Sequence, residues 1–175
     1  LAIKDAPNAM QFLDSLNYEW NFSEATMQAS PADQKSDTHV HVHQLTNEHD
    51  EITQILMHAF GDTEEEVHTL LNFNESNPSR HVYVAKMDET CVGTVTVVEE
   101  DKSFWITALA TDVSKRGQGI GSAILHFVLA EAKNREVEKV MLDVEIDNAG
   151  ALSIYEKAGF KTNLQIDYYV KTTTN

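Results

Sequence analysis

The stretch that most constrains the fold of this chain is Arg-Gly-Gln-Gly-Ile-Gly at residues 116–121. It follows an apolar run at 104–113, which we interpret as a strand, and precedes an amphipathic run at 122–133, which we interpret as a helix. Three alternating glycines allow a sharp turn and leave no Cβ between the backbone N–H groups and a ligand. The unpaired N–H groups and the positive dipole end of a helix start favour an anion, above all a phosphate. Arg116 adds a full positive charge, so the sequence predicts a phosphate-binding turn between a strand and a helix.

Glycines alone also fit a mobile surface loop, so the known phosphate-binding motifs were compared with this stretch. A Walker A loop ends in Gly-Lys-Ser/Thr, and the chain contains no Gly-Lys pair. A dinucleotide-binding fingerprint requires its third glycine where Ser122 stands. The remaining pattern is Arg-x-x-Gly-x-Gly at Arg116, Gly119 and Gly121. This pattern resembles the acetyl-CoA diphosphate loop of the GNAT superfamily of N-acetyltransferases.

A second pattern lies at residues 148–160. Asn148 is suited to cap a helix and Gly159 to end one, so a short helix is the simplest interpretation of both. The spacing also resembles the motif that follows the fifth strand of GNAT enzymes. That motif has an Asn, an Ala three residues later, a Tyr four residues after that, here Tyr155, and a closing Gly-Phe. Two motifs in the right order, with a strand-like stretch between them, make a chance match improbable.

The resemblance covers about residues 38–170 and implies an α/β (α+β) architecture, the GNAT fold. In that fold a mixed central β-sheet of about six to seven strands is flanked by helices, and the fourth and fifth strands are splayed apart. The sequence periodicity agrees with this, because residues 80–99 alternate as a hairpin and residues 140–147 alternate as a half-buried strand. A helix between the strands at 103–113 and 140–147 predicts that these two run parallel.

The resemblance also implies roles for particular residues. The backbone of the fourth strand would pair with the amides of the pantetheine arm, at Leu109, Ala110 and Thr111, where Thr111 takes a place that is usually Val. The diphosphate would be held by Arg116, Gly117, Gln118, Gly119, Ile120, Gly121 and Ser122. Asn148 would reach the pantetheine side of the cofactor, and Tyr155 would lie beside the sulfur.

Acetyl transfer to an amine needs a neutral amine, a polarised carbonyl and a proton for the departing thiolate. Tyr155 is the candidate general acid, because a thiolate in a partly dry slot can take a proton from a phenol within hydrogen-bond reach. A backbone donor from the fourth strand could stabilise the oxyanion. The sequence does not identify the general base that would deprotonate the amine. Some family members carry a Glu where this chain has Ser103, and the nearby carboxylates that could act through water are Glu99, Glu100 and Asp101.

The sequence therefore predicts an enzyme that transfers the acetyl group of acetyl-CoA to a primary amine of a small molecule or peptide, by direct attack in a ternary complex. Acetyl-CoA is expected as co-substrate, and no metal is expected. The alternative is a non-catalytic acyl-CoA-binding module of a tandem GNAT protein. Tyr155 and the intact glycine loop favour the enzyme, and the missing carboxylate at Ser103 favours the module.

Composition narrows the class of protein further. Hydrophobic residues make up 42% and charged residues 23% of the 175 residues, as in an ordinary globular protein. The formal net charge of −15 argues against nucleic acid and against an anionic membrane surface as partners, because either would repel the protein. No apolar run approaches membrane-spanning length and the start does not resemble a signal peptide, so we expect a cytoplasmic protein. The acidity is compatible with a cationic amine as substrate, and solubility alone also explains it.

Two smaller features have structural interpretations. His39, His41 and His43 alternate along one face of a predicted strand. They could bind a metal or face solvent, and we favour the solvated face because no neighbouring residue completes a ligand shell. The single cysteine, Cys91, lies in a strand-like stretch and is interpreted as a buried structural thiol.

The first 37 residues differ from the rest. Leu1 stands where an initiator Met is expected, which suggests a fragment of a longer chain. Residues 9–18 align without a gap on residues 151–160, so residues 1–37 are either the remnant of a first GNAT-like unit or an unrelated helix and strand with a linker. The repeat predicts a helix at 7–16 and a strand near 20–28. We expect the acetyltransferase domain at 38–175, with a second copy of the chain or an upstream GNAT-like unit as a macromolecular partner.

Overall fold

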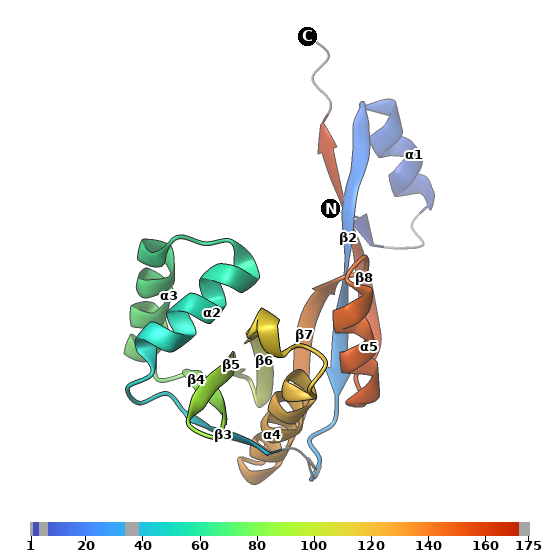
Figure 1. The fold of residues 1–175 in the computed structure, drawn as a ribbon. Helices are drawn as coiled ribbons and strands as arrows, with labels where there is room; N and C mark the ends of the chain where they lie inside the picture. Colours follow the sequence, from blue (N-terminus) through green and yellow to red (C-terminus); the bar gives the residue numbers. More distant parts are fainter. Residues whose placement is uncertain (1, 4–6, 34–38, 172–175) are drawn as a thin grey trace. The chain divides into compact units, whose positions relative to one another are not determined.

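A computed structural model describes residues 2–3, 7–33 and 39–171 of the chain. The chain forms two compact units, which are treated separately (Figure 1). The described residues up to Gln28 and from Leu142 onward form the first, which we call the terminal unit. Residues Ala29–Met141 form the second, which we call the body.

The body consists of four antiparallel strands with helices on both faces. Its elements are β3 (Val40–Gln44), α2 (His49–Phe60), α3 (Glu64–Ser76), β4 (Arg80–Met87), β5 (Thr90–Glu100), β6 (Ser103–Thr111), the short 3-10 helix η1 (Val113–Lys115) and α4 (Ile120–Asn134). The strand order is β6-β5-β4-β3, so each strand pairs with its neighbour in sequence. Strand β7 (Lys139–Glu145) begins in the body and ends in the terminal unit.

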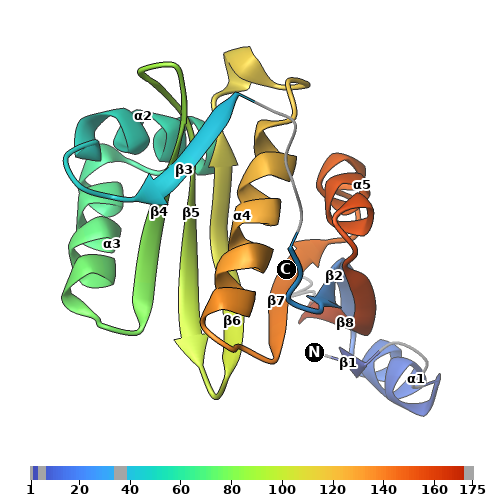
Figure 2. The ribbon, with the colours of Figure 1, turned by 90° about the horizontal axis from the view of Figure 1, so that it is seen from below.

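Alternation along β4 explains why both faces of the body are covered. Val82 and Val84 are buried in one hydrophobic cluster with side chains of α2 and α3. Tyr83, between them, contacts the ring of Phe127 of α4, with the ring centroids 5.0 Å apart. Successive side chains of a strand point to opposite faces, so α2 and α3 cover one face and α4 the other. Figure 2 shows α4 running alongside the strands β5 and β6.

The predicted hairpin and helices are present, with shifts at some ends. The hairpin at 80–99 is β4 and β5, joined by a turn in which Asp88 has a φ of 54°. The predicted strand at 103–113 ends at Thr111, because Asp112 begins a 3-10 turn. Helix α2 begins after Glu48, which is its N-cap residue.

Glu48 holds the segment that leads from β3 into α2. Its carboxylate is buried and accepts hydrogen bonds from the backbone N–H groups of Thr46 and Asn47, at 3.1 Å each. The ammonium of Lys86 on β4 lies 2.9 Å away, and His43 on β3 lies 3.0 Å away. The hydrogen bond from Lys86 is the largest cause that holds the pKa of Glu48 well below its usual range.

The terminal unit joins the two ends of the chain. Its elements are β1 (Ala2–Ile3), α1 (Pro7–Ser15), β2 (Tyr18–Ala29), the end of β7, α5 (Ala149–Lys157) and β8 (Lys161–Lys171). Within this unit the strand order is β1-β8-β2-β7. The predicted N-terminal helix and strand are therefore present as α1 and β2.

Strand β2 is an integral part of this sheet. It pairs antiparallel with β8 from Tyr18 opposite Lys171 to Gln28 opposite Lys161 (Figure 1). The buried Ser23 hydroxyl on β2 donates to the carboxylate of Asp167 on β8 at 2.6 Å. Because a buried hydroxyl and carboxylate each need a partner, this pair fixes the register of the two strands.

Candidate active site

The segment between β6 and α4 is anchored before the glycines begin. The N–H of Asp112 donates to the carbonyl of Val92 on β5 at 2.9 Å. The Asp112 carboxylate accepts hydrogen bonds from the N–H and the hydroxyl of Ser114, at 2.8 Å each. These bonds, that of the Ser114 hydroxyl first, lower the pKa of Asp112. The chain thus enters the glycine turn from a fixed position.

The glycine turn has the backbone conformation that requires glycine. Gly117 has a φ of 79° and Gly119 a φ of 78°, in the left-handed region that other residues rarely adopt. Gly119 is the N-cap of α4 and has no side chain with which to cap the helix. The first helical hydrogen bond runs from the N–H of Ala123 to the carbonyl of Gly119, at 2.9 Å.

The backbone N–H groups of residues 117–122 are available to a ligand. Within residues 2–3, 7–33 and 39–171, no protein group accepts a hydrogen bond from any of these six amides. Amides without an acceptor, at the positive dipole end of a 15-residue helix, favour an anion. Arg116 is exposed beside them. The overall charge is −15, so attraction for a polyanion has to be local.

The start of α4 is held close to the sheet by a glycine that the sequence analysis did not identify. A Cβ on Gly93 of β5 would lie 2.9 Å from the carbonyl oxygen of Ala110 and 2.9 Å from Cδ1 of Ile124 on α4. Both distances are shorter than a carbon atom permits. A glycine inside a strand pattern often marks such a close approach, and that was the available signal.

The end of β6 keeps its pairing with β5 through the predicted cofactor-binding strand residues. Leu109, Ala110 and Thr111 lie opposite Val95, Thr94 and Gly93. Closer to the start of β6 the register shifts, because Ala108 lies opposite Thr96 but Ile106 lies opposite Val97. Thr107 is therefore an extra, bulged residue. Bulges turn a strand locally and are frequent beside active sites, and nothing in the sequence pattern predicted this one.

The second group of predicted residues lies in the terminal unit. Asn148 is the N-cap of α5, and its side-chain oxygen accepts a hydrogen bond from the N–H of Ala151 at 3.1 Å. The helix ends before Gly159, which has a φ of 96°. The helix-cap and helix-stop interpretations of these two residues are thus confirmed.

Tyr155 has the properties of a protonated phenol in a partly dry environment. It is half-buried on α5, and its ring meets that of Phe160 edge to face with centroids 6.0 Å apart. Burial raises the pKa of Tyr155 above its ordinary value. The phenol therefore carries its proton at neutral pH and can donate it.

Among the carboxylates considered as a base, Glu99 is already paired with a guanidinium. It accepts a hydrogen bond at 2.6 Å from Arg135, the C-cap residue of α4, and lies 3.4 Å from the Nε2 of His81. Asp101 lies in the β5–β6 turn with a φ of 45° and is exposed. Ser103 is buried at the start of β6. Glu99 thus belongs to an ion-pair cluster that ties α4 to the sheet.

His41 is exposed as predicted, whereas His43 is half-buried and bonded to Glu48 at 3.0 Å. In the part of the chain that the structure describes, no group of three or more His, Cys, Asp or Glu side chains could hold a metal ion. None of the described helices is long and apolar enough to cross a membrane. Cys91 is buried, as expected of a structural thiol.

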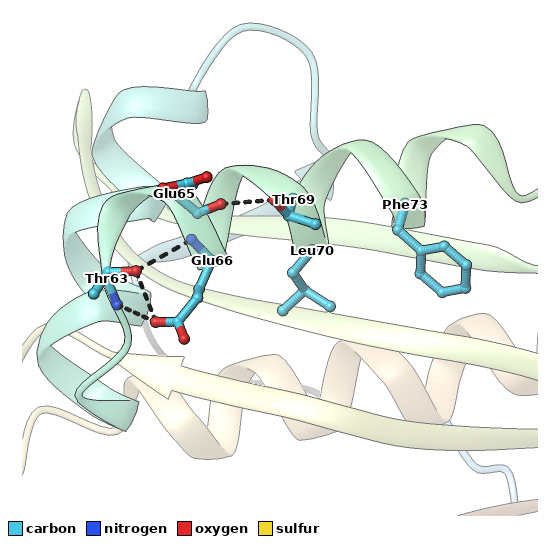
Figure 3. Close-up of a pocket in the computed structure, with 6 residues that line it drawn as sticks. All are labelled: Thr63, Glu65, Glu66, Thr69, Leu70 and Phe73. Atoms are coloured by element: carbon cyan, nitrogen blue, oxygen red, sulfur yellow. Dashed lines mark hydrogen bonds between the residues drawn. The ribbon is translucent and has the colours of Figure 1, made fainter.

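A hollow of about 590 Å³ lies on α3 (Figure 3). Its lining comes from this helix and its cap alone, at Thr63, Glu65, Glu66, Thr69, Leu70 and Phe73. Leu70 and Phe73 point to the same side in Figure 3, with the Thr63–Glu66 pair at the helix start. None of the residues predicted to bind the cofactor or to act in catalysis lines this hollow.

The family of the chain follows from comparison with known proteins. The acetyltransferase (GNAT) family profile matches residues 42–160, more than half of the chain. The chain belongs to this family. The [ribosomal protein bS18]-alanine N-acetyltransferase of Escherichia coli is 34% identical over 65 residues, covering 37% of this chain and 44% of that protein. The chain spans less than half the length of the first curated relatives that it matches.

Solved structures show the same fold. A GCN5-related N-acetyltransferase from Sphaerobacter thermophilus superimposes with a TM-score of 0.80 at 19% identity, over 95% of this chain and 56% of that one. A GNAT family acetyltransferase from Elizabethkingia anophelis, solved with acetyl-CoA bound, has a TM-score of 0.59 at 24% identity, over 72% of this chain and 78% of that one. The fold is the GNAT fold, a mixed sheet flanked by helices.

Proposed function

We propose that the protein is an N-acetyltransferase that moves the acetyl group of acetyl-CoA to a primary amine of a small molecule or peptide. The observation that carries this proposal is the set of six backbone N–H groups at 117–122, which have no acceptor in the described residues, at the start of a helix in a GNAT fold. The structure of a family member with acetyl-CoA bound supports the choice of co-substrate.

The residues of the body suit the binding part of this role. The amides from Gly117 to Ser122 would hold the diphosphate, with Arg116 supplying a charge-assisted contact. The left-handed glycines fit this role, since any Cβ there would need a strained backbone. The backbone of Leu109, Ala110 and Thr111 would pair with the pantetheine arm. Acetyl-CoA supplies an activated acyl group as a thioester.

The chemical step forms a C–N bond and breaks a C–S bond, and the departing sulfur needs a proton. We assign that proton to Tyr155, whose raised pKa keeps it protonated at neutral pH. The proton lost by the attacking amine passes to solvent, since Glu99 is occupied by Arg135. Positioning of the two reactants supplies much of the remaining acceleration.

The proposed class of acceptor amine rests on the net charge of the protein and on the name of one relative. A net charge of −15 favours the approach of a cationic amine. The Escherichia coli relative is named for the alanine of a ribosomal protein, which makes peptide amino termini a sensible first panel of acceptors. Nucleic acid and anionic membrane surfaces are not proposed as partners, and we place the reaction in the cytoplasm.

The proposal is tested by thiol release from acetyl-CoA over a panel of small amines and peptides. Cys91 is buried, so its own thiol adds little background to a thiol reagent. Tyr155→Phe should lower kcat by about 100-fold while leaving the KM for acetyl-CoA unchanged. Tyr169→Phe, on β8, is the matched control and should leave kcat unchanged. Binding of acetyl-CoA without turnover across the whole panel would instead support a non-catalytic acyl-CoA-binding module.

A further inference from the structure

The terminal unit contains an internal twofold repeat. It is built from two strand–helix–strand segments, β1–α1–β2 and β7–α5–β8. The strand order β1-β8-β2-β7 is unchanged when each element is exchanged for its counterpart. Helices α1 and α5 have nine residues each, and the strands that follow have 12 and 11.

The sequence alignment of the two segments matches this exchange. It places Ala9 on Ala151, and the same offset carries Ala2 of β1 onto Val144 of β7. It also places Glu24 on Ile166, and these two residues are direct partners in the β2–β8 pairing. A twofold axis through an antiparallel pair relates the two partners at its centre, and this pair lies in the middle of both strands.

The registers of the outer strands provide an independent check. Ala2 of β1 lies opposite Asp167 of β8. Applied to this pair, the alignment places Val144 of β7 opposite Ala25 of β2. Two residues further along β7, Ile146 then lies opposite Ser23. The Ile146 N–H does donate to the Ser23 carbonyl, at 3.0 Å. The pairing of β7 with β2 therefore has the register that the repeat requires.

The same register places Thr26 opposite Asp143, and this pair is also joined. The Thr26 hydroxyl donates to the Asp143 carboxylate at 2.6 Å. Two separate contacts thus agree with one offset, and an unrelated helix and strand would have no reason to reproduce it.

The two halves differ in exposure. Leu16, at the end of α1, is 44% exposed, whereas its counterpart Ala158 is 2% exposed. Phe12 is 62% exposed, and its counterpart Ile154 is 36% exposed. An exposed apolar helix face beside a sheet edge commonly marks an interaction surface. The comparison identifies the apolar side of α1 as the surface that lacks a cover.

We propose that α1 and the outer edge of β8 bind a second acetyltransferase-type body. This second body precedes β1 in the same polypeptide, as the body described here precedes β7. The repeat specifies the occupant, because β7 is the strand through which a body joins the unit and β1 is its counterpart. The Sphaerobacter structure supports this choice. It matches 95% of this chain, yet this chain covers only 56% of it, so a matching terminal unit occurs there with additional chain.

The test compares the 175-residue chain with the native polypeptide isolated from its source. Intact mass should exceed 19.6 kDa by roughly one further body. Hydrogen exchange at the β8 amides that face away from β2 should be slowed at least about tenfold in the native polypeptide relative to the 175-residue chain. A native polypeptide without such a body, or equal exchange at these amides in both proteins, would overturn the proposal.

A matched pair of substitutions locates the surface. Phe12→Lys in the native polypeptide should restore fast exchange at the outer edge of β8, whereas Asp14→Lys, on the opposite side of α1, should not. Both positions are exposed in the 175-residue chain, so neither variant should alter its unfolding transition. Exchange is read without substrate, so the result is independent of acetyl transfer.

Discussion

The helices α3 and α4 of the body begin in opposite ways. At α3 the Thr63 hydroxyl accepts a hydrogen bond from the N–H of Glu66, and the Glu66 carboxylate accepts one from the N–H of Thr63 (Figure 3). At α4 the cap is Gly119, which has no side chain. A helix that only has to be stable satisfies its own first turn, whereas α4 leaves its first donors unpaired. This difference supports the proposed diphosphate site at α4 more strongly than the number of glycines does.

The largest effect is expected where α4 meets the sheet. Gly93→Ala should lower the free energy of unfolding by about 2–3 kcal/mol, because its Cβ would overlap the Ala110 carbonyl and the Ile124 side chain. Gly150→Ala, in α5, is the control. Its Cβ would lie 3.8 Å from the nearest atom, the Asn148 oxygen, and it should be neutral or slightly stabilising. Equal losses in urea denaturation would show that Gly93 does not hold α4 to the sheet.

Acid should act first on the start of α2. The pKa of Glu48 is lowered in the folded protein, mainly by Lys86, so its contribution to stability is present above the ordinary glutamate pKa. That contribution is lost as the pH falls through and below that range. Glu48→Gln should be less stable at neutral pH and should show a shallower loss of stability on acidification. A parallel pH dependence in the two proteins would contradict this role.

A carboxylate placed at α4 should separate ligand binding from helix stability. Ser122→Glu would put a negative charge beside the open amides, where it stabilises the helix dipole but repels a diphosphate. The Kd for acetyl-CoA should rise at least about tenfold, while thermal unfolding without ligand stays unchanged or shifts slightly upward. Calorimetric titration measures the first and scanning calorimetry the second. Unchanged affinity would remove the diphosphate from this turn.

The smallest effect is expected at the closed helix start. Thr63→Ala should cost about 1 kcal/mol of unfolding free energy, because one side of the reciprocal cap is lost. The Kd for acetyl-CoA should not change, since no predicted cofactor contact lies at α3. A change in affinity without a change in stability would reverse the roles that the two helix starts have here.

The sequence predicted local structure correctly where few residue types can meet a requirement of the backbone. The glycine turn and the Asn148 cap follow from backbone requirements that act within a few residues. The N-terminal helix and strand were predicted from their resemblance to residues 151–160.

Features that depend on distant partners were not predictable. Gly93 matters because α4 crosses β5 there, and Thr107 bulges because of its pairing with β5. The buried Glu48 carboxylate is compensated by Lys86, which lies on another strand. In each case the deciding contact joins segments that the pattern along the chain leaves unrelated.

The central claim is that the open start of α4 binds the diphosphate of acetyl-CoA, and amide chemical shifts test it most directly. In a ¹⁵N-labelled sample titrated with coenzyme A, the largest shifts should fall on Gly117 to Ser122 and none on Thr63 to Glu66. Pantetheine, which lacks the diphosphate, should leave the residues 117–122 nearly unmoved. Equal shifts with both ligands at residues 117–122, or no shift there at saturating coenzyme A, would contradict the account.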